Sequence, residues 1–267
     1  MTVRDLETVL AWAAAEGWNP GLSDAAAFLV ADPAGFSIWD EDGIAVAAIS
    51  VVNHDAANAF LGLYICHPDW RGKGVGFKLW IEALKHAGSR GVGLDGVAAQ
   101  QANYAKSGFV LTGSTIRFEG TLPPETSPNV RDATPADLAA LLALDQLATG
   151  YRRENFITAW TAQSDARQTL VFNDLSGFAT IRLCQSGCKI GPVIASSATD
   201  AVALIKAAAA QLPNRPLIID LPDARADLIA ALTTFGFQET FRTARMYRGT
   251  KPETNGTTFA IATMELG

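Results

Sequence analysis

The residues best suited to chemistry stand in one short glycine-rich segment, residues 66–76, which reads CHPDWRGKGVG. Its three alternating glycines let backbone N–H groups approach an anion without hindrance from Cβ atoms. Arg71 and Lys73 add positive charge, and a helical pattern begins here, so the partial positive charge of a helix N-terminus is added to theirs. The segment predicts a site for a polyanion with little room around it, such as a diphosphate.

Two other phosphate-binding motifs fit this segment less well. A Walker loop requires Ser or Thr after its lysine, whereas Gly74 follows Lys73. A dinucleotide fingerprint requires G-x-G-x-x-G, and Phe77 stands where its last glycine would be. A glycine-rich turn between a strand and a helix, with solvated cations, is the remaining structural interpretation.

The same segment resembles motif A of the GNAT superfamily of acyl-CoA N-acetyltransferases, R/Q-x-x-G-x-G/A. Arg71, Gly74 and Gly76 occupy its specified positions. A second GNAT signature, Y-x-x-x-G-F, is matched by Tyr104 to Phe109. The resemblance covers about residues 1–120 and implies acetyl-CoA, or another acyl-CoA, as co-substrate.

The resemblance also implies roles for individual residues. The GNAT sheet splays beside its central strand and holds the pantetheine arm in the gap, here against the backbone of Ile65, Cys66 and His67. The pyrophosphate would lie on the backbone of Arg71, Gly72, Lys73, Gly74, Val75 and Gly76, with Asn103 and Lys106 as further cofactor contacts. Tyr104 corresponds to the general acid, and a phenol of pKa about 10 is protonated at neutral pH and can donate to a departing thiolate.

The general base is not identified by the sequence. GNAT proteins often carry a glutamate near the central strand, but the strand expected at residues 59–66 has no carboxylate. A water relay, a group from the second half of the chain, or His54 or Asp55 remain as alternatives.

The elements that position these residues alternate between strands and helices. A hairpin is expected from residues 36–39 and 44–52, followed by the apolar central strand, the glycine loop and a helix with Phe77, Trp80, Ile81 and Leu84 on one face. A strand at 91–97, a short helix at 101–107 and a strand at 109–118 complete a mixed α/β sheet.

The chain contains this unit twice. Val130-Arg131-Asp132 repeats Val3-Arg4-Asp5 as an expected helix start, and Arg245 follows Gly236 as Arg117 follows Gly108. We therefore expect a catalytic GNAT domain at residues 1–122, a linker at 123–129 and a second GNAT-like domain at 130–267.

The second unit lacks the marks of a cofactor site. Residues 189–197 have no alternating glycines, and Leu232 stands where Tyr104 stands in the first unit. The chain thus resembles tandem GNAT proteins with a degenerate C-terminal domain, of the holothin-acyltransferase-like kind, in which the second unit shapes the acceptor site. A polar segment that could face the cleft, or simply lie on the surface, is formed by Asp145, Tyr151, Arg152 and Arg153.

The composition and net charge of the chain restrict the classes of partner that we expect it to bind. A chain of 267 residues with 49% hydrophobic and 18% charged residues can bury a core. The net charge of −6 argues against nucleic acid or an anionic membrane as partner. Three cysteines, no spanning segment and no signal-peptide pattern favour a cytoplasmic protein, and no metal site is expected, since Cys184 and Cys188 at a hairpin tip have no further ligands nearby.

These observations lead to one leading hypothesis: direct transfer of an acetyl or other short acyl group from acyl-CoA to a primary amine of a small molecule. A non-catalytic acyl-CoA-binding sensor or scaffold, and a protein N-acetyltransferase, are the alternatives. The identity of the amine and the oligomeric state are not encoded in any pattern we recognise.

Overall fold

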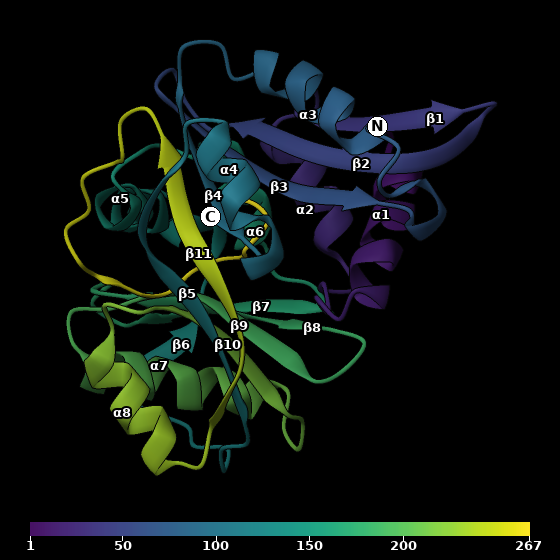
Figure 1. Ribbon diagram of the computed structural model, residues 1–267. Helices are drawn as coiled ribbons and strands as arrows, with labels where there is room; N and C mark the ends of the chain where they lie inside the picture. Colours follow the sequence, from purple (N-terminus) through teal and green to yellow (C-terminus); the bar gives the residue numbers. More distant parts are fainter.

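The computed structural model describes all residues from 1 to 267. The first half of the chain contains the expected mixture of helices and strands (Figure 1). Its helices are α1 (Val3–Ala15), α2 (Asp24–Ala31), α3 (Val75–Lys85) and α4 (Gln101–Lys106). Its strands are β1 (Phe36–Glu41), β2 (Ile44–Asn53), β3 (Asn58–Cys66), β4 (Gly91–Gly96) and β5 (Val110–Gly120).

The second half follows a similar order and adds a strand at each end. Its helices are α5 (Leu138–Thr149), α6 (Glu154–Trp160), α7 (Ala198–Gln211) and α8 (Ala226–Thr234). Its strands are β6 (Val130–Asp132), β7 (Arg167–Phe172), β8 (Phe178–Leu183), β9 (Cys188–Ile194), β10 (Leu217–Pro222), β11 (Gln238–Arg248) and β12 (Thr258–Ala260). No helix in the chain is both long and apolar enough to cross a membrane.

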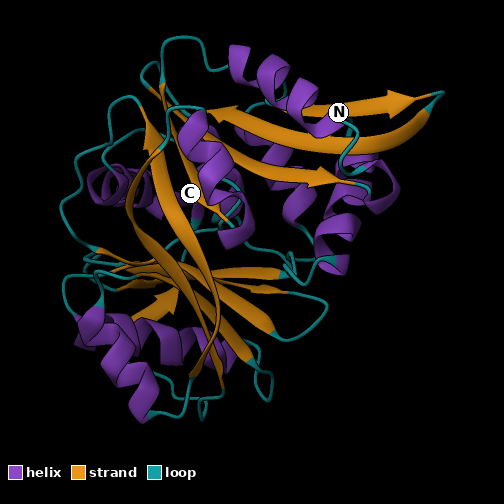
Figure 2. Cartoon of the chain, viewed as in Figure 1, coloured by secondary structure: helices purple, strands orange, loops and turns teal.

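All strands join one mixed sheet in which the two halves exchange their last long strands. The order is β1-β2-β3-β4-β11-β5-β10-β9-β8-β7-β6, and β12 pairs with β9. Strand β11 of the second half therefore lies between β4 and β5 of the first half, and β5 pairs with β10 of the second. Figures 1 and 2 show β5 and β11 as two long neighbouring strands that run from one half of the molecule into the other.

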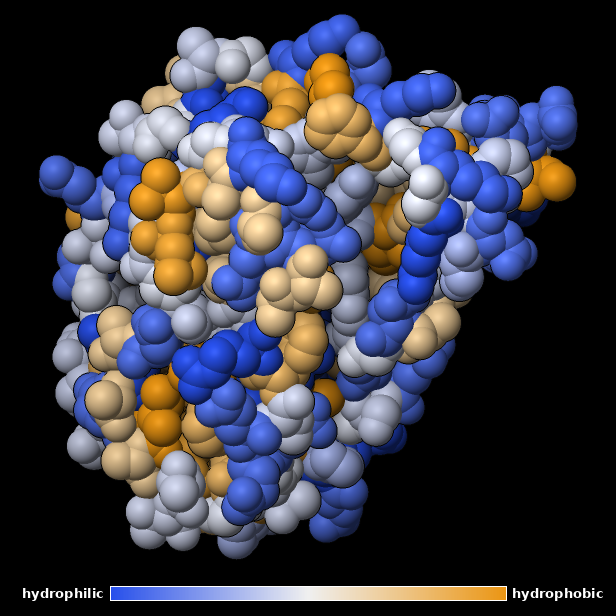
Figure 3. All heavy atoms as spheres, viewed as in Figure 1, coloured by the Kyte–Doolittle hydropathy of each residue, from blue (hydrophilic) through white to orange (hydrophobic).

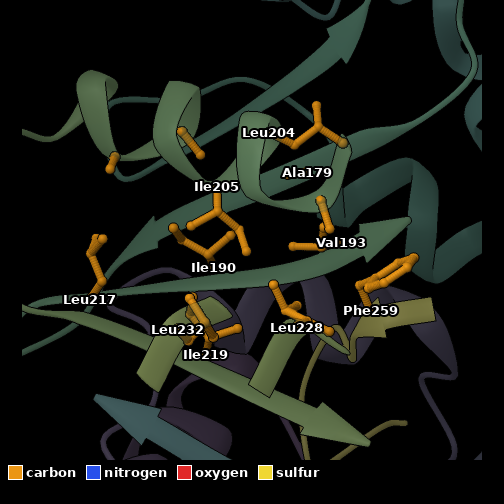
Figure 4. Close-up of a cluster of buried hydrophobic side chains, with 14 of the residues drawn as sticks. Ala179, Ile190, Val193, Leu204, Ile205, Leu217, Ile219, Leu228, Leu232 and Phe259 are labelled. Atoms are coloured by element: carbon orange, nitrogen blue, oxygen red, sulfur yellow. The ribbon is translucent and has the colours of Figure 1, made fainter. Parts of the chain in front are cut away.

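The helices bury the two halves of the sheet on both faces. Helix α3 covers β1–β3 on one outer face, whereas α7 and α8 cover the other outer face, where Ile205 of α7 points toward Ile190 of β9 (Figure 4). Helices α1, α2 and α6 form a shared core between the halves, in which Phe28 and Trp160 stack with ring centroids 5.9 Å apart. The mixed α/β sheet predicted from the sequence is confirmed.

Two details of the sequence prediction are wrong. Residues 130–132 form strand β6 instead of a helix start. The equivalent helical segments of the two units begin at capping boxes, which pair Thr2 with Asp5 in the first unit and Thr134 with Asp137 in the second. On α3, Trp80 and Leu84 are buried, but Phe77 is 62% exposed and Ile81 46% exposed, because Val75, Leu79 and Ala83 supply the rest of the buried face.

Candidate active site

The sheet opens beside the carboxyl end of β3. Strands β3 and β4 pair in parallel only from Asn58 to Leu61, opposite Gly91 to Leu94. Beyond that point β3 pairs with β2 alone, and its register shifts where Leu63 adopts a positive φ of 46°. A buried leucine in this conformation is strained, and such strain is typical of functional sites. The edge of β3 from Gly62 to Cys66 therefore faces an opening with unpaired backbone groups.

The glycine loop follows β3 directly and starts α3. Gly72 and Gly74 have φ values of 75° and 80°, which only glycine adopts readily, and Gly74 is the N-cap of α3 without any side-chain cap. The first hydrogen bond of the helix runs from the N–H of Lys78 to the carbonyl of Gly74, so the preceding N–H groups remain available. This exposed helix N-terminus is suited to a phosphate group.

The side chain of Arg71 is fixed at the edge of the loop. Its Nε donates to the carbonyl of Cys66 over 2.9 Å, and its Nη2 pairs with the carboxylate of Glu16, which follows α1. The Nζ of Lys73 lies 4.7 Å from the ring centre of Trp70. Both cations thus lie at the loop, although Arg71 shares its charge with a carboxylate.

A groove of about 510 Å³ connects the loop with the opening in the sheet. Six of the residues predicted to bind the cofactor line it: Ile65, Cys66, Arg71, Gly72, Gly74 and Gly76. On the face drawn in Figure 3, hydrophilic atoms predominate, and apolar atoms show in a hollow between the regions of α1 and α4. His67, Lys73 and Val75 belong to the loop but do not line the groove, and neither do Asn103, which donates to Gln100, and the exposed Lys106.

A second, narrower cavity of about 70 Å³ continues the groove into the molecule. The two share four lining residues, Trp18, Tyr64, Val97 and Gln100. Tyr104 forms part of its wall: the ring is buried and stacks on Trp80 at 5.3 Å and 19°. Burial, with a smaller effect of Tyr64, raises the pKa of the Tyr104 phenol, so the side chain stays protonated and can serve as an acid or hydrogen-bond donor but not as a base.

Tyr64 lies where the groove and the cavity meet, and the sequence reasoning missed it. A Cβ on Gly76 would come within 2.8 Å of the Tyr64 hydroxyl, and a Cβ on Gly96 within 2.5 Å of the Tyr104 ring. Gly76 and Gly96 therefore make room for the two phenols. Tyr64 and Gly76 lie on different elements, so only the fold shows that this ring meets this glycine.

The inner end of the cavity carries charged residues from both halves. Arg117 of β5 binds Asp220 of β10 through two hydrogen bonds, of 2.7 and 2.9 Å, and Glu265 lies beside them. Asp95 also lines the cavity but binds Arg245 of β11.

The two residues considered as a base near the central strand lie elsewhere. His54 packs against the rings of Tyr151 and Phe156, and Asp55 caps the turn before β3 by accepting from the N–H groups of Ala57 and Asn58. Neither residue lines the groove or the cavity.

The corresponding opening in the second half is filled by the chain itself. Strand β9 pairs with β10 only at Cys188 to Ile190, and β12 then pairs with β9 at Val193 and Ile194. Helix α7, the counterpart of α3, is capped by Ser197, whose hydroxyl accepts from the N–H of Asp200.

The polar residues that the sequence placed near the cleft have different environments. Asp145 and Arg153 form a buried ion pair, Tyr151 is buried and Arg152 is exposed.

A splayed sheet, an uncapped glycine-initiated helix and a groove that ends at a buried tyrosine define an acyltransferase of the N-acetyltransferase fold. The chain belongs to the GNAT family. Residues 4–109 match the family model described as acetyltransferase (GNAT) family, and residues 141–260 match the one described as acetyltransferase (GNAT) domain. The chain is thus a tandem GNAT acyltransferase, and its family implies an acyl-CoA co-substrate.

Similar proteins support this assignment over the full length. Holothin acyltransferase of Pseudoalteromonas sp. (strain SANK 73390) is 33% identical, over all of this chain and 92% of its own length. A solved structure of a candidate acetyltransferase from Pyrococcus horikoshii has a TM-score of 0.85 at 20% identity and covers 100% of this chain and 94% of that one. A tandem GNAT protein from the clavulanic acid biosynthesis pathway has a TM-score of 0.61 at 14% identity, with coverages of 92% and 96%.

Proposed function

We propose that the enzyme transfers an acetyl or other short acyl group from acyl-CoA directly to a primary amine of a small molecule. One observation carries the proposal: a single groove leads from the free N–H groups of α3, past the unpaired edge of β3, to a cavity walled by Tyr104. The diphosphate would bind at the loop and the pantetheine along Ile65 to His67. The thioester would then reach the cavity. The relative named holothin acyltransferase supports a small molecule as acceptor.

The geometry favours a small acceptor over a protein. Phe241 and Thr243 of β11, together with Met264 and Glu265, close the cavity from the second half, and Trp18 closes it from α1's side. A protein N-terminus or lysine would need a wider approach. We therefore assign to the second unit, residues 130–267, a role in shaping the acceptor site, while β12 and the capped α7 support the proposal that this unit binds no CoA.

Each step has a residue suited to it. Binding acyl-CoA beside the amine makes the attack effectively unimolecular. Unpaired N–H groups on the β3 edge can polarise the thioester carbonyl. Tyr104, kept protonated by burial, would donate its proton to the CoA thiolate as the C–S bond breaks.

The proposal is tested by binding first and turnover second. Calorimetric titration should show acetyl-CoA binding to the wild type and much weaker binding to Gly74→Val, which blocks the left-handed N-cap. Thiol release should then be followed with acetyl-CoA and longer acyl-CoAs against holothin and a panel of primary amines. Tight binding without thiol release from any amine would favour the sensor or scaffold, and absence of binding would refute the CoA site.

A further inference from the structure

The segment from Ile261 to Gly267 connects the two openings of the sheet. Its first residue belongs to the second half, where the N–H of Ile261 donates to the carbonyl of Asp220 over 2.9 Å. Its later part lies against β3 of the first half: the carbonyl oxygen of Glu265 would be 2.1 Å from a Cβ on Gly62, and His54 Nε2 donates to the carbonyl of Leu266 over 2.8 Å. Gly62 is thus a glycine because the segment occupies the place of its side chain.

This segment brings a carboxylate to the strand that lacks one. Glu265 is only 6% exposed and lines the same cavity as Tyr104, Tyr64 and Gly62. The hydroxyl of Thr263 donates to its Oε2, which orients the carboxylate. Glu265 therefore forms part of the wall around the space in which the thioester and the acceptor would meet.

The cations near Glu265 are engaged by other groups. Arg117 binds Asp220 and the carbonyl of Trp18, and Lys189 donates to the same carbonyl over 2.9 Å. None of the ion pairs within 4 Å in the chain includes Glu265. Asp95, the other carboxylate on the cavity wall, is held by Arg245 and by the hydroxyl of Thr115. The charge of Glu265 acts on Arg117 and Lys189 from a distance, but Glu265 forms no ion pair within 4 Å with either, so it is the carboxylate of the cavity that can still take a direct cationic partner.

We infer that Glu265 binds the ammonium group of the acceptor and acts as the general base of the transfer. The inference rests on the proposed function and identifies the base that β3 does not supply. The acceptor ammonium passes one proton to Glu265, and the resulting amine attacks the thioester carbonyl carbon to form the C–N bond. The C–S bond then breaks, Tyr104 protonates the thiolate, and the second nitrogen proton restores the phenol. The proton on Glu265 leaves to solvent, so amide, free thiol and one proton are the products.

Direct binding tests the inference without knowledge of the natural acceptor. Two stable CoA thioethers serve as probes, one ending in a primary ammonium and one in a methyl group at the same distance from sulfur. We expect the wild type to prefer the ammonium probe by about tenfold or more, and Glu265→Gln to lose this preference while binding acetyl-CoA as before. Glu253→Gln changes an exposed glutamate earlier in the C-terminal part of the chain and should keep the preference for the ammonium probe.

The outcomes separate this inference from the proposed function. If wild type and Glu265→Gln prefer the ammonium probe equally, or if the wild type shows no preference although it binds acetyl-CoA, Glu265 is not the base. If the wild type binds neither probe nor acetyl-CoA, the proposed function fails instead. Should Glu265→Gln not fold, Thr263→Val removes the orienting hydroxyl and should still reduce the preference; an unchanged preference there would overturn the inference.

Turnover gives an independent reading. With an amine found in the panel, Glu265→Gln should lower the rate of thiol release by about 10²- to 10⁴-fold, as expected for loss of a general base. Full activity of this variant would exclude the role.

Discussion

Arg117 of β5 and Asp220 of β10 form a buried, two-hydrogen-bond ion pair that joins the last strand of the first unit to the second unit. Arg245 of β11 and Asp95 of β4 repeat the pair in the opposite direction, with hydrogen bonds of 2.9 and 2.6 Å. The arginines are 128 residues apart and the aspartates 125, so the duplicated sequence places the same pair twice. An aspartate of each unit thus neutralises a buried arginine of the other unit, and the two ion pairs fix the two halves of the active-site wall relative to each other.

Breaking one of these pairs should destabilise the whole protein. Asp220→Asn leaves the buried guanidinium of Arg117 without its carboxylate, and such uncompensated charges cost about 3–5 kcal/mol. Urea unfolding should therefore show a clearly lower midpoint. Asp165→Asn, at an exposed loop position, should change stability by less than about 0.5 kcal/mol. Equal midpoints for the two variants would show that the pair contributes little.

Removal of the Tyr104 hydroxyl should separate chemistry from binding. Tyr104→Phe keeps the stacking on Trp80, so we expect acetyl-CoA affinity within about twofold of wild type and a rate of thiol release about 10²- to 10⁴-fold lower. Because burial raises the pKa of this phenol, the wild-type rate should not fall through its ionisation near pH 10, where an ordinary tyrosine loses its proton. Tyr151→Phe, a buried phenol outside the cavity, is the matched control and should retain activity.

The pairing of Glu16 with Arg71 should weaken CoA binding. The carboxylate of Glu16 lines the same groove as the glycine loop, so it repels a diphosphate and competes for Arg71. Glu16→Gln should tighten acetyl-CoA binding by up to about fivefold, which corresponds to a partly exposed charge interaction of less than about 1 kcal/mol. Glu7→Gln, which changes an exposed glutamate on α1 away from the groove, should leave the affinity unchanged. Weaker binding by Glu16→Gln would instead show that the pair holds Arg71 in its binding position.

The sequence located those segments of the candidate site that carry a short local motif. The glycine loop and Tyr104 each lie in a local motif whose conformation depends on its own residues, and the structure places the glycines at the start of α3 and Tyr104 on the cavity wall. Tyr64 was missed because its place between the groove and the cavity depends on packing against Gly76, on the next helix. The position of Glu265 beside β3 could not be predicted from the sequence, because its segment crosses from one unit to the other.

The exchange of strands was equally hidden in the sequence. The spacing from Gly108 to Arg117, repeated from Gly236 to Arg245, indicated the duplication, but each unit alone could also form a closed sheet of its own. The choice is made by long-range pairing of β4 with β11 and of β5 with β10, which no local pattern encodes. The helix start predicted at Val130 is wrong for a related reason: the three-residue match pairs Asp132 with Asp5, whereas the capping residue that corresponds to Asp5 is Asp137.

The stability of the protein should decrease on mild acidification because of His54. Burial, together with the positive charge of Arg153, lowers the pKa of this imidazole from 6.5 to about 4. The unfolded chain therefore binds more protons than the folded one between these values, so the contribution of His54 is complete above pH 6.5 and is lost as the pH falls toward 4. The difference between pH 7 and pH 5 amounts to about 2 kcal/mol for this group. His54→Gln, which can still donate to the carbonyl of Leu266, should show a correspondingly smaller loss of unfolding free energy in urea titrations at the two pH values. A wild-type protein equally stable at pH 7 and pH 5 would mean that His54 is freely protonated in the folded state.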